Sequence, residues 1–101
     1  MGFRVELARA AERDRDGVVE YLLKGAASKA SAVAFLDGLE TVLGPLKDYP
    51  LMYPLSQEPR LARMGYHKAL FGNYLALYRL EGERVIVARV FHQRRDYAKL
   101  V

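Results

Sequence analysis

Residues 71–92, FGNYLALYRLEGERVIVARVFH, place two turn signals among apolar and aromatic residues. The first, Gly72-Asn73, has the length and the leading glycine of a tight β-hairpin turn. The second is the Glu-Gly-Glu sequence at 81–83. Together with the apolar run before Gly72, these signals predict three consecutive antiparallel strands at about 62–71, 74–80 and 84–92.

The first turn also sets a register for the predicted sheet. Placing Phe71 opposite Tyr74 brings Lys68 opposite Leu77. Opposite residues share a face, so strict alternation assigns to one face His67, Ala69, Phe71, Tyr74, Ala76, Tyr78, Val85, Val87, Arg89 and Phe91. It assigns to the other Lys68, Leu70, Leu75, Leu77, Arg79, Ile86, Ala88, Val90 and His92. Both predicted faces are largely apolar.

The chain before this sheet predicts one strand and two helices. FRVEL, at 3–7, alternates apolar and charged residues as a half-exposed strand does. A helical period follows, ended by Gly25, with the apolar residues Ala11, Val18, Val19, Leu22 and Leu23. Ser28 is placed to cap a second helix, which Gly44-Pro45 should kink or end and whose apolar residues are Ala32, Leu36, Leu39, Leu43 and Leu46. The short link at 26–28 predicts an antiparallel helix pair.

These elements define an α+β fold in a single domain over residues 1–101. The predicted order is an N-terminal strand, an antiparallel two-helix hairpin, a three-stranded antiparallel meander and a short C-terminal helix at 94–100. A helix pair covers one face of a sheet, so the second apolar face needs another cover. Two alternatives remain open: a protein partner, or the proline-rich loop at 49–60 folded over it with the terminal helix.

The net charge of +4 comes entirely from the end of the chain. Residues 1–83 carry eleven basic and eleven acidic side chains, whereas residues 84–101 carry five basic side chains and Asp96 alone. Clustered cations are typical of a surface that binds phosphate or an acidic partner, although a solvated strand end has the same composition.

The composition also argues against several classes of protein. The absence of cysteine excludes a disulfide framework and thiolate metal sites, and it fits a reducing cytoplasm. Charged residues interrupt the apolar positions near the N-terminus, so we expect neither a signal peptide nor a membrane span. Two histidines offer no metal-ligand spacing, and we expect no metal or cofactor.

Two segments carry a resemblance to a known family: GNYLALYRL at 72–80, and VIVARVFHQRRDYAKLV at 85–101 with its His-x-Arg-Arg-Asp-Tyr ending. With the strand and helix pair before them, the chain resembles the RelE/ParE superfamily of toxins from bacterial type II toxin–antitoxin systems over nearly its whole length. The resemblance implies a RelE/ParE-like fold, a growth-inhibiting toxin acting in the cytoplasm, and a cognate antitoxin that would also cover the open apolar face. It further implies one of two targets: messenger RNA cleaved on the ribosome, which the basic C-terminus favours, or DNA gyrase.

Metal-independent RNA cleavage sets defined chemical demands. The enzyme activates the substrate's 2′-hydroxyl, stabilises the phosphorane with cations and protonates the leaving oxygen. The resemblance and the basic residues together predict a catalytic set of Lys68, Arg79, His92 and Arg95, with Arg94, Tyr97 and Lys99 as substrate-binding residues. Leu75 departs from the family pattern, because many ribonuclease members carry there an arginine that faces the scissile phosphate. Loss of such a cation costs on the order of a hundredfold in rate, unless Arg79 substitutes for it.

Non-catalytic alternatives stay open for several of these residues. His67 is expected to pack beside Tyr78 rather than to catalyse. An ion pair between Arg95 and Asp96 that only orders the tail is the alternative to a catalytic Arg95. Arg89, among apolar neighbours, is expected to have a carboxylate partner. For the whole chain, the remaining hypothesis is a non-catalytic, partner-binding domain of the same fold.

Overall fold

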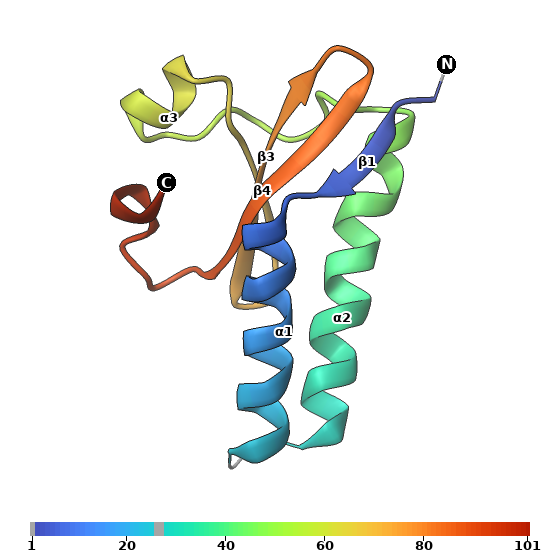
Figure 1. Cartoon of the computed structure of the whole chain (residues 1–101), viewed down its shortest axis with the longest axis vertical. Helices are drawn as coiled ribbons and strands as arrows, with labels where there is room; N and C mark the ends of the chain where they lie inside the picture. The colour runs from blue at the N-terminus through green and yellow to red at the C-terminus, as the bar shows by residue number, and fades with distance from the viewer. Residues whose placement is uncertain (1, 26–27) are drawn as a thin grey trace.

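A computed structural model describes residues 2–25 and 28–101. In chain order the elements are β1 (Arg4–Leu7), α1 (Arg9–Lys24), α2 (Lys29–Leu43), a 3₁₀ turn (Gly44–Lys47), α3 (Pro59–Arg63), β2 (His67–Phe71), β3 (Tyr74–Glu81), β4 (Arg84–His92) and a second 3₁₀ turn (Tyr97–Leu100). The strands form one sheet in the order β1-β4-β3-β2 (Figure 1). The predicted α+β order is confirmed, with β1 added to the meander as a fourth strand parallel to β4. None of the described helices is both long and apolar enough to cross a membrane.

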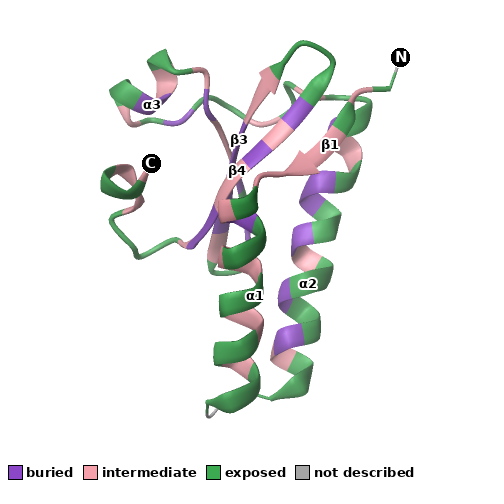
Figure 2. Ribbon diagram, viewed as in Figure 1, coloured by how far each residue is buried: buried purple, intermediate pink, exposed green. Residues whose placement is uncertain are grey.

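Helices α1 and α2 lie side by side and pack on one face of the sheet, here called the helix face (Figure 1). The residues 26 and 27 of their predicted link lie outside the described part. Ser28 caps α2 as predicted, because its hydroxyl accepts a hydrogen bond from the Ser31 backbone N–H at 3.3 Å. The predicted inner positions Leu23 and Leu36 are exposed, and Phe35 and Val42 are buried instead, along the side of α2 that is purple in Figure 2.

The main apolar core lies between the two helices and the helix face of the sheet. The helical side contributes Ala11, Phe35, Leu39, Val42, Leu43 and Leu46. The sheet contributes Ala69, Phe71, Ala76, Tyr78, Val85, Val87 and Val90. Because these residues alternate with those of the opposite face along β2 and β3, they agree with the predicted period of two in those strands.

The predicted hairpin register is confirmed, but the face assignment at the end of β4 is wrong. Phe71 pairs with Tyr74, and Lys68 pairs with Leu77. Between β3 and β4, however, Leu77 pairs with Arg89 while Tyr78 pairs with Val87, so Ala88 is an extra residue in a β-bulge. An extra residue reverses the alternation that follows it. Arg89 and Phe91 therefore lie on the face of Lys68, whereas Val90 and His92 lie on the helix face.

The face opposite the helices, here called the second face, has its own apolar cluster. Leu75, Leu77 and Phe91 of the sheet pack there with Leu61 and Tyr66. The C-terminal segment, residues 94–101, lies over this cluster through Tyr97, Ala98 and Val101. Of the two open alternatives, cover from within the chain is thus present over part of this face. Leu70, on the outer strand β2, remains 52% exposed.

Two predicted element boundaries need correction. The first strand of the meander was predicted from about residue 62, but α3 and a turn at Gly65 occupy that stretch and β2 begins at His67. Pro59 stands in the first turn of α3, where a missing N–H costs nothing, and Gly65 has φ +84° where the chain turns into the sheet. The predicted C-terminal helix at 94–100 is only the 3₁₀ turn Tyr97–Leu100.

Candidate functional site

Cations and aromatic rings meet on the second face. The Lys68 ammonium lies 3.4 Å from the Tyr97 hydroxyl and 5.8 Å from the centre of the Tyr97 ring. Tyr97 in turn stacks on Phe91, with the ring centres 6.1 Å apart. The guanidinium groups of Arg89 and Arg95 lie 4.5 Å and 5.9 Å from the centre of the Phe91 ring. This cation–aromatic surface brings together three of the predicted site residues: Lys68, Arg95 and Tyr97.

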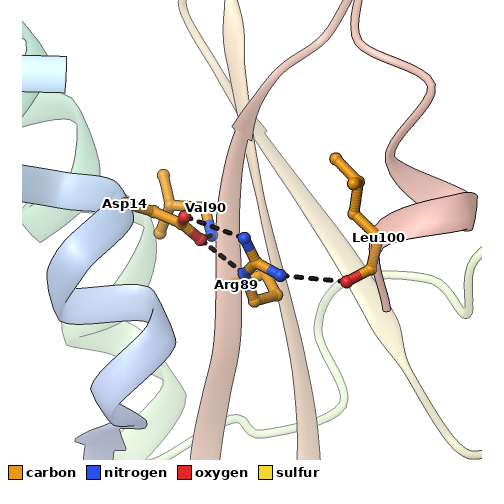
Figure 3. A network of polar contacts seen from close by, with 4 residues as sticks. All are labelled: Asp14, Arg89, Val90 and Leu100. Atoms are coloured by element: carbon orange, nitrogen blue, oxygen red, sulfur yellow. Dashed lines mark hydrogen bonds and ion pairs between the residues drawn. The ribbon is translucent and has the colours of Figure 1, made fainter. Parts of the chain in front are cut away.

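Arg89 anchors this surface to α1 (Figure 3). Its Nε and Nη2 atoms donate to the two carboxylate oxygens of Asp14 at 2.7 Å and 3.0 Å. Asp14 Oδ2 also accepts the backbone N–H of Val90 at 3.0 Å, beyond the point where β1 stops pairing with β4. The hydrogen bonds that Arg89 donates to Asp14 raise the pKa of Arg89 above its ordinary value. Asp14 is the carboxylate partner that the sequence required without identifying.

His92 lies on the other side of the sheet from Lys68. It pairs with Tyr74 across the strands, with the two rings edge to face and their centres 5.3 Å apart. Its Nδ1 accepts the backbone N–H of Arg94 at 3.1 Å, so the neutral ring carries its proton on Nε2. His92 also lines a shallow pocket of about 420 Å³ together with Arg13, Tyr21, Tyr74 and Arg95. His92 thus shares a pocket with Arg95 but is separated from Lys68 by the sheet.

The other predicted site residues are dispersed. Arg79 forms an ion pair with Glu81 at 3.3 Å, and its guanidinium lies 5.2 Å from the centre of the Tyr66 ring. Lys99 is exposed and pairs with Asp96 at 3.3 Å, so the predicted pair between Arg95 and Asp96 is replaced by this one. Arg94 is exposed on the turn after β4.

Leu75 occupies the middle of the second face and is 1% exposed. It packs in the cluster with Leu61, Leu77 and Phe91, beneath the C-terminal segment. Burial in an apolar cluster strongly disfavours a charged group, so this position does not present a cation to a substrate. Arg79, which the sequence offered as a replacement, is held instead against Tyr66 and Glu81.

The structure assigns His67 a packing role. Its Nδ1–H donates to the Tyr53 carbonyl oxygen at 2.8 Å, and its ring stacks on Tyr78 with the centres 5.1 Å apart. The first contact ties the proline-rich loop to β2, next to a bridge between Leu55 and His67, and the second joins β2 to β3. The proline-rich loop, which the sequence offered as a cover for the second face, therefore packs here along the outer edge of the sheet.

Ion pairs neutralise some of the basic side chains in the last eighteen residues. Arg84 makes two hydrogen bonds to the carboxylate of Glu6, at 2.9 Å and 3.0 Å, and these lower the pKa of Glu6. Arg89 is neutralised by Asp14 in the same way. Within these eighteen residues, the basic side chains without a carboxylate partner in the described structure are Arg94 and Arg95, at the start of the C-terminal segment.

Sequence reasoning missed two residues of this surface, Asp14 and Arg60. Asp14 sits among several acidic residues of α1, and nothing in the helical pattern singles it out. Arg60 on α3 donates through Nη2 to the carbonyl oxygens of Ala98 and Val101, the latter at 2.9 Å. The Pro59-Arg60 sequence gave a signal for α3, namely proline at a first helical position, but none for these contacts.

Comparisons with known proteins agree on one kind of protein. Residues 5–97 match the family model described as the ParE toxin of the type II toxin–antitoxin system parDE. Among solved structures, a chromosomal ParDE toxin–antitoxin system from Pseudomonas aeruginosa matches with a TM-score of 0.70 and 16% identity, over 89% of this chain and 95% of that one. The toxin–antitoxin complex RelBE2 from Mycobacterium tuberculosis matches with a TM-score of 0.59 and 27% identity, over 91% and 92% of the two chains.

A third similar structure carries no functional name. A conserved hypothetical protein from Helicobacter pylori matches with a TM-score of 0.56 and 11% identity, over 89% of this chain and 93% of that one. At 16% and 11% identity the structural likenesses show a shared fold. Among curated proteins, none matches the chain.

Proposed function

Since the chain belongs to the ParE toxin family of type II toxin–antitoxin systems, we propose that it arrests growth by inhibiting DNA gyrase. A cognate antitoxin is its partner in the cell, as the toxin–antitoxin systems among its structural relatives support. Gyrase acts in the cytoplasm, and the proposal places the toxin there too. The surface that meets the target is, in this proposal, the C-terminal segment with Arg94 and Arg95, for which the described part of the chain holds no carboxylate partner.

The burial of Leu75 is the observation that carries the choice of target. At this position the resemblance to ribonuclease members calls for an arginine that faces the scissile phosphate. Here the side chain is 1% exposed and lies under the C-terminal segment. Because residue 75 is buried within this apolar cluster, the second face offers a packing surface at this position rather than a site for a substrate phosphate.

The distribution of the predicted catalytic residues supports the same choice. Phosphoryl transfer by side chains alone needs a base, cations and an acid around one phosphate. Lys68 and His92 lie on opposite faces of the sheet, because the bulge at Ala88 turns His92 toward the helix face. Arg79 is engaged by Glu81. A protein–protein inhibitor has no such requirement for convergence.

Ribosome-dependent RNA cleavage remains the second candidate, and one contact favours it. Lys68 and Tyr97 touch on the second face, and Arg95 reaches the same Phe91 ring that Tyr97 stacks on. A cation beside an aromatic ring is an arrangement that suits a stacked base and its phosphate. In this candidate Lys68 and Arg95 are the catalytic cations, and Tyr97 stacks on the base.

The test uses two targets in parallel. The purified toxin is added to DNA gyrase with relaxed plasmid and ATP, and separately to ribosomes carrying a defined messenger RNA without added metal. We expect supercoiling to be inhibited and the message to stay intact. Arg95→Ala should weaken the inhibition by about tenfold, whereas Arg63→Ala, which changes an exposed arginine of α3, should leave it unchanged.

Two other outcomes would each support a different function. New 5′ ends confined to one codon on the ribosome, lost in Lys68→Ala, would replace gyrase by messenger RNA as the target. A protein that neither inhibits gyrase nor cuts RNA, and whose expression leaves growth unaffected, would be the non-catalytic binding domain of the third hypothesis.

A further inference from the structure

The guanidinium group of Arg89 contacts three different residues: Asp14, Leu100 and Phe91. Two of its nitrogens bind Asp14, and the third, Nη1, donates to the backbone carbonyl oxygen of Leu100 at 2.9 Å (Figure 3). Its Cζ atom also lies 4.5 Å from the centre of the Phe91 ring. One side chain thus connects α1, the end of β4 and the last residues of the chain.

A second arginine, on α3, holds the residues on either side of Leu100. Arg60 on α3 donates to the carbonyl oxygens of Ala98 and Val101. Three of the last four carbonyl oxygens are therefore held by two guanidinium groups that come from different parts of the fold. These two contacts, the Arg89 clamp and the Arg60 clamp, do not share a partner.

Apolar packing alone gives the last residues of the C-terminal segment little support. The 3₁₀ turn at Tyr97–Leu100 contains no buried residue and is only four residues long. Such a turn is too short to be stable by itself. Its place on the second face depends on the stacking of Tyr97 on Phe91, on the partly buried Ala98 and Val101, and on the two clamps.

We propose that Arg89, oriented by Asp14, and Arg60 are positioning residues that hold the C-terminal segment in the geometry in which it meets the toxin's target. The part of this inference that concerns the target rests on the proposed function. The holding of the segment does not, since it can be measured without any target.

Only arginine can make the contacts of the Arg89 clamp together. A planar fork with five N–H donors serves both oxygens of Asp14 and still has a donor for Leu100. A lysine at this position keeps the charge, but its single ammonium cannot span the carboxylate of α1 and the carbonyl oxygen of the C-terminal segment. Arg89→Lys therefore separates the charge from the geometry.

The experiment compares three arginine-to-lysine variants. Arg89→Lys and Arg60→Lys each open one clamp, and Arg60 is exposed, so its variant does not threaten the fold. Arg84→Lys is the matched control, because Arg84 lies on the same strand and makes the same two-pronged pair with Glu6, far from the C-terminal segment. For each protein we measure millisecond hydrogen exchange of the amides of residues 97–101, the free energy of unfolding, and growth arrest on controlled expression.

We expect exchange at 97–101 to become about fivefold faster in each clamp variant, the change that one lost hydrogen bond gives. Growth arrest should weaken in both clamp variants, and the Arg84→Lys protein should match the unchanged chain in exchange at 97–101 and in growth arrest. Exchange at 97–101 that stays the same in both clamp variants would overturn the inference. Faster exchange with undiminished growth arrest would also overturn it, because the position of the segment would then not matter for the target.

The outcome stays separate from that of the proposed function. If the unchanged protein arrests growth but does not inhibit gyrase, the proposed target is wrong. The clamps are still judged by exchange and by growth arrest, neither of which presumes a particular target.

Discussion

Tyr78 is a polar side chain in the middle of the apolar core. It is 0% exposed, its hydroxyl donates to the Pro50 carbonyl oxygen at 2.8 Å, and its ring packs between His67 and Tyr53. Burial raises the pKa of Tyr78 to about 12, since the charged phenolate is disfavoured without water. The residue therefore links the proline-rich loop to the sheet through a group that must keep its proton.

This arrangement predicts a loss of stability in alkali. The unfolded chain releases the Tyr78 proton near pH 10, whereas the folded chain holds it to about pH 12. The stabilisation is therefore complete below pH 10 and decreases as the pH rises toward 12, by about 1.4 kcal/mol per pH unit. Tyr78→Phe should lose about 1 kcal/mol of unfolding free energy at pH 7, because the hydrogen bond is gone, and should show a smaller decrease above pH 10.

Urea unfolding at pH 7, 9, 10 and 11 measures both effects. Tyr74→Phe serves as the comparison, because burial also raises the pKa of Tyr74 but this residue is only partly buried. A Tyr78→Phe protein with the same alkaline decrease as the unchanged chain would contradict the assignment to Tyr78.

The sequence predicted that certain side chains require a partner more reliably than it predicted which residue that partner is. It showed that Arg89 required a carboxylate, because a guanidinium among apolar residues must be paired. It could not select Asp14 from the acidic residues of α1, because that choice depends on how the helix crosses the end of β4. The sequence equally did not show what covers Leu75, since its cluster joins residues from distant parts of the chain, from Leu61 before it to Phe91 and Tyr97 after it.

Each long helix carries one glycine, and the two glycines have different surroundings. Gly17 of α1 is exposed, and a Cβ added there would have no atom within 4 Å. Gly38 of α2 faces the sheet, and a Cβ there would stand 3.0 Å from Phe71 Cδ2. The Phe71 ring is itself confined by Phe35 and Tyr74, so it has little room to move.

Alanine at these two positions should therefore have opposite effects. Gly17→Ala removes backbone freedom from the unfolded chain and should stabilise the protein by about 0.5–1 kcal/mol. Gly38→Ala removes the same backbone freedom from the unfolded chain but forces Phe71 to shift. We therefore expect the free energy of unfolding to fall by about 1 kcal/mol. Thermal unfolding of both variants checks this, and an equal rise of Tm in the two would show that Phe71 yields freely.

One extra residue in β4, Ala88, explains why the predicted faces of the last residues of that strand are wrong. The two hairpin turns and the register of β2 against β3 followed from Gly72 and Gly82, both of which have positive φ in the structure, at +54° and +62°. Ala88 gave no comparable signal, since alanine fits a bulge and a regular strand alike. Strict alternation therefore placed His92 on the face of Lys68, whereas the structure places these two members of the predicted catalytic set on opposite faces. Helix α3 was missed because its five residues are too few for a period to appear.

For the whole molecule, the sheet is covered unequally on its two faces. The helix face carries two helices of sixteen and fifteen residues, whereas the second face carries α3 and the short C-terminal segment. The sequence showed that both faces are apolar and left the cover of the second face open. It could not decide this, because the clamps of Arg60 and Arg89 act on backbone carbonyl groups, which every sequence has.

Removal of the C-terminal segment should uncover the second face without unfolding the sheet. A chain ending at Gln93 keeps α1, α2, all four strands and the larger core, but it loses Tyr97, Ala98 and Val101 from the cluster around Phe91. We expect native far-ultraviolet circular dichroism, strong binding of an apolar dye such as ANS, and association of the molecules at micromolar concentration, because large exposed apolar patches drive association. Lys99→Ala is the control, since Lys99 is exposed and pairs only with Asp96 among the described residues. If the shortened chain is folded but neither binds the dye nor associates, removal of the C-terminal segment has not exposed an apolar surface on the second face. The role of the segment as a cover for that face would then be wrong.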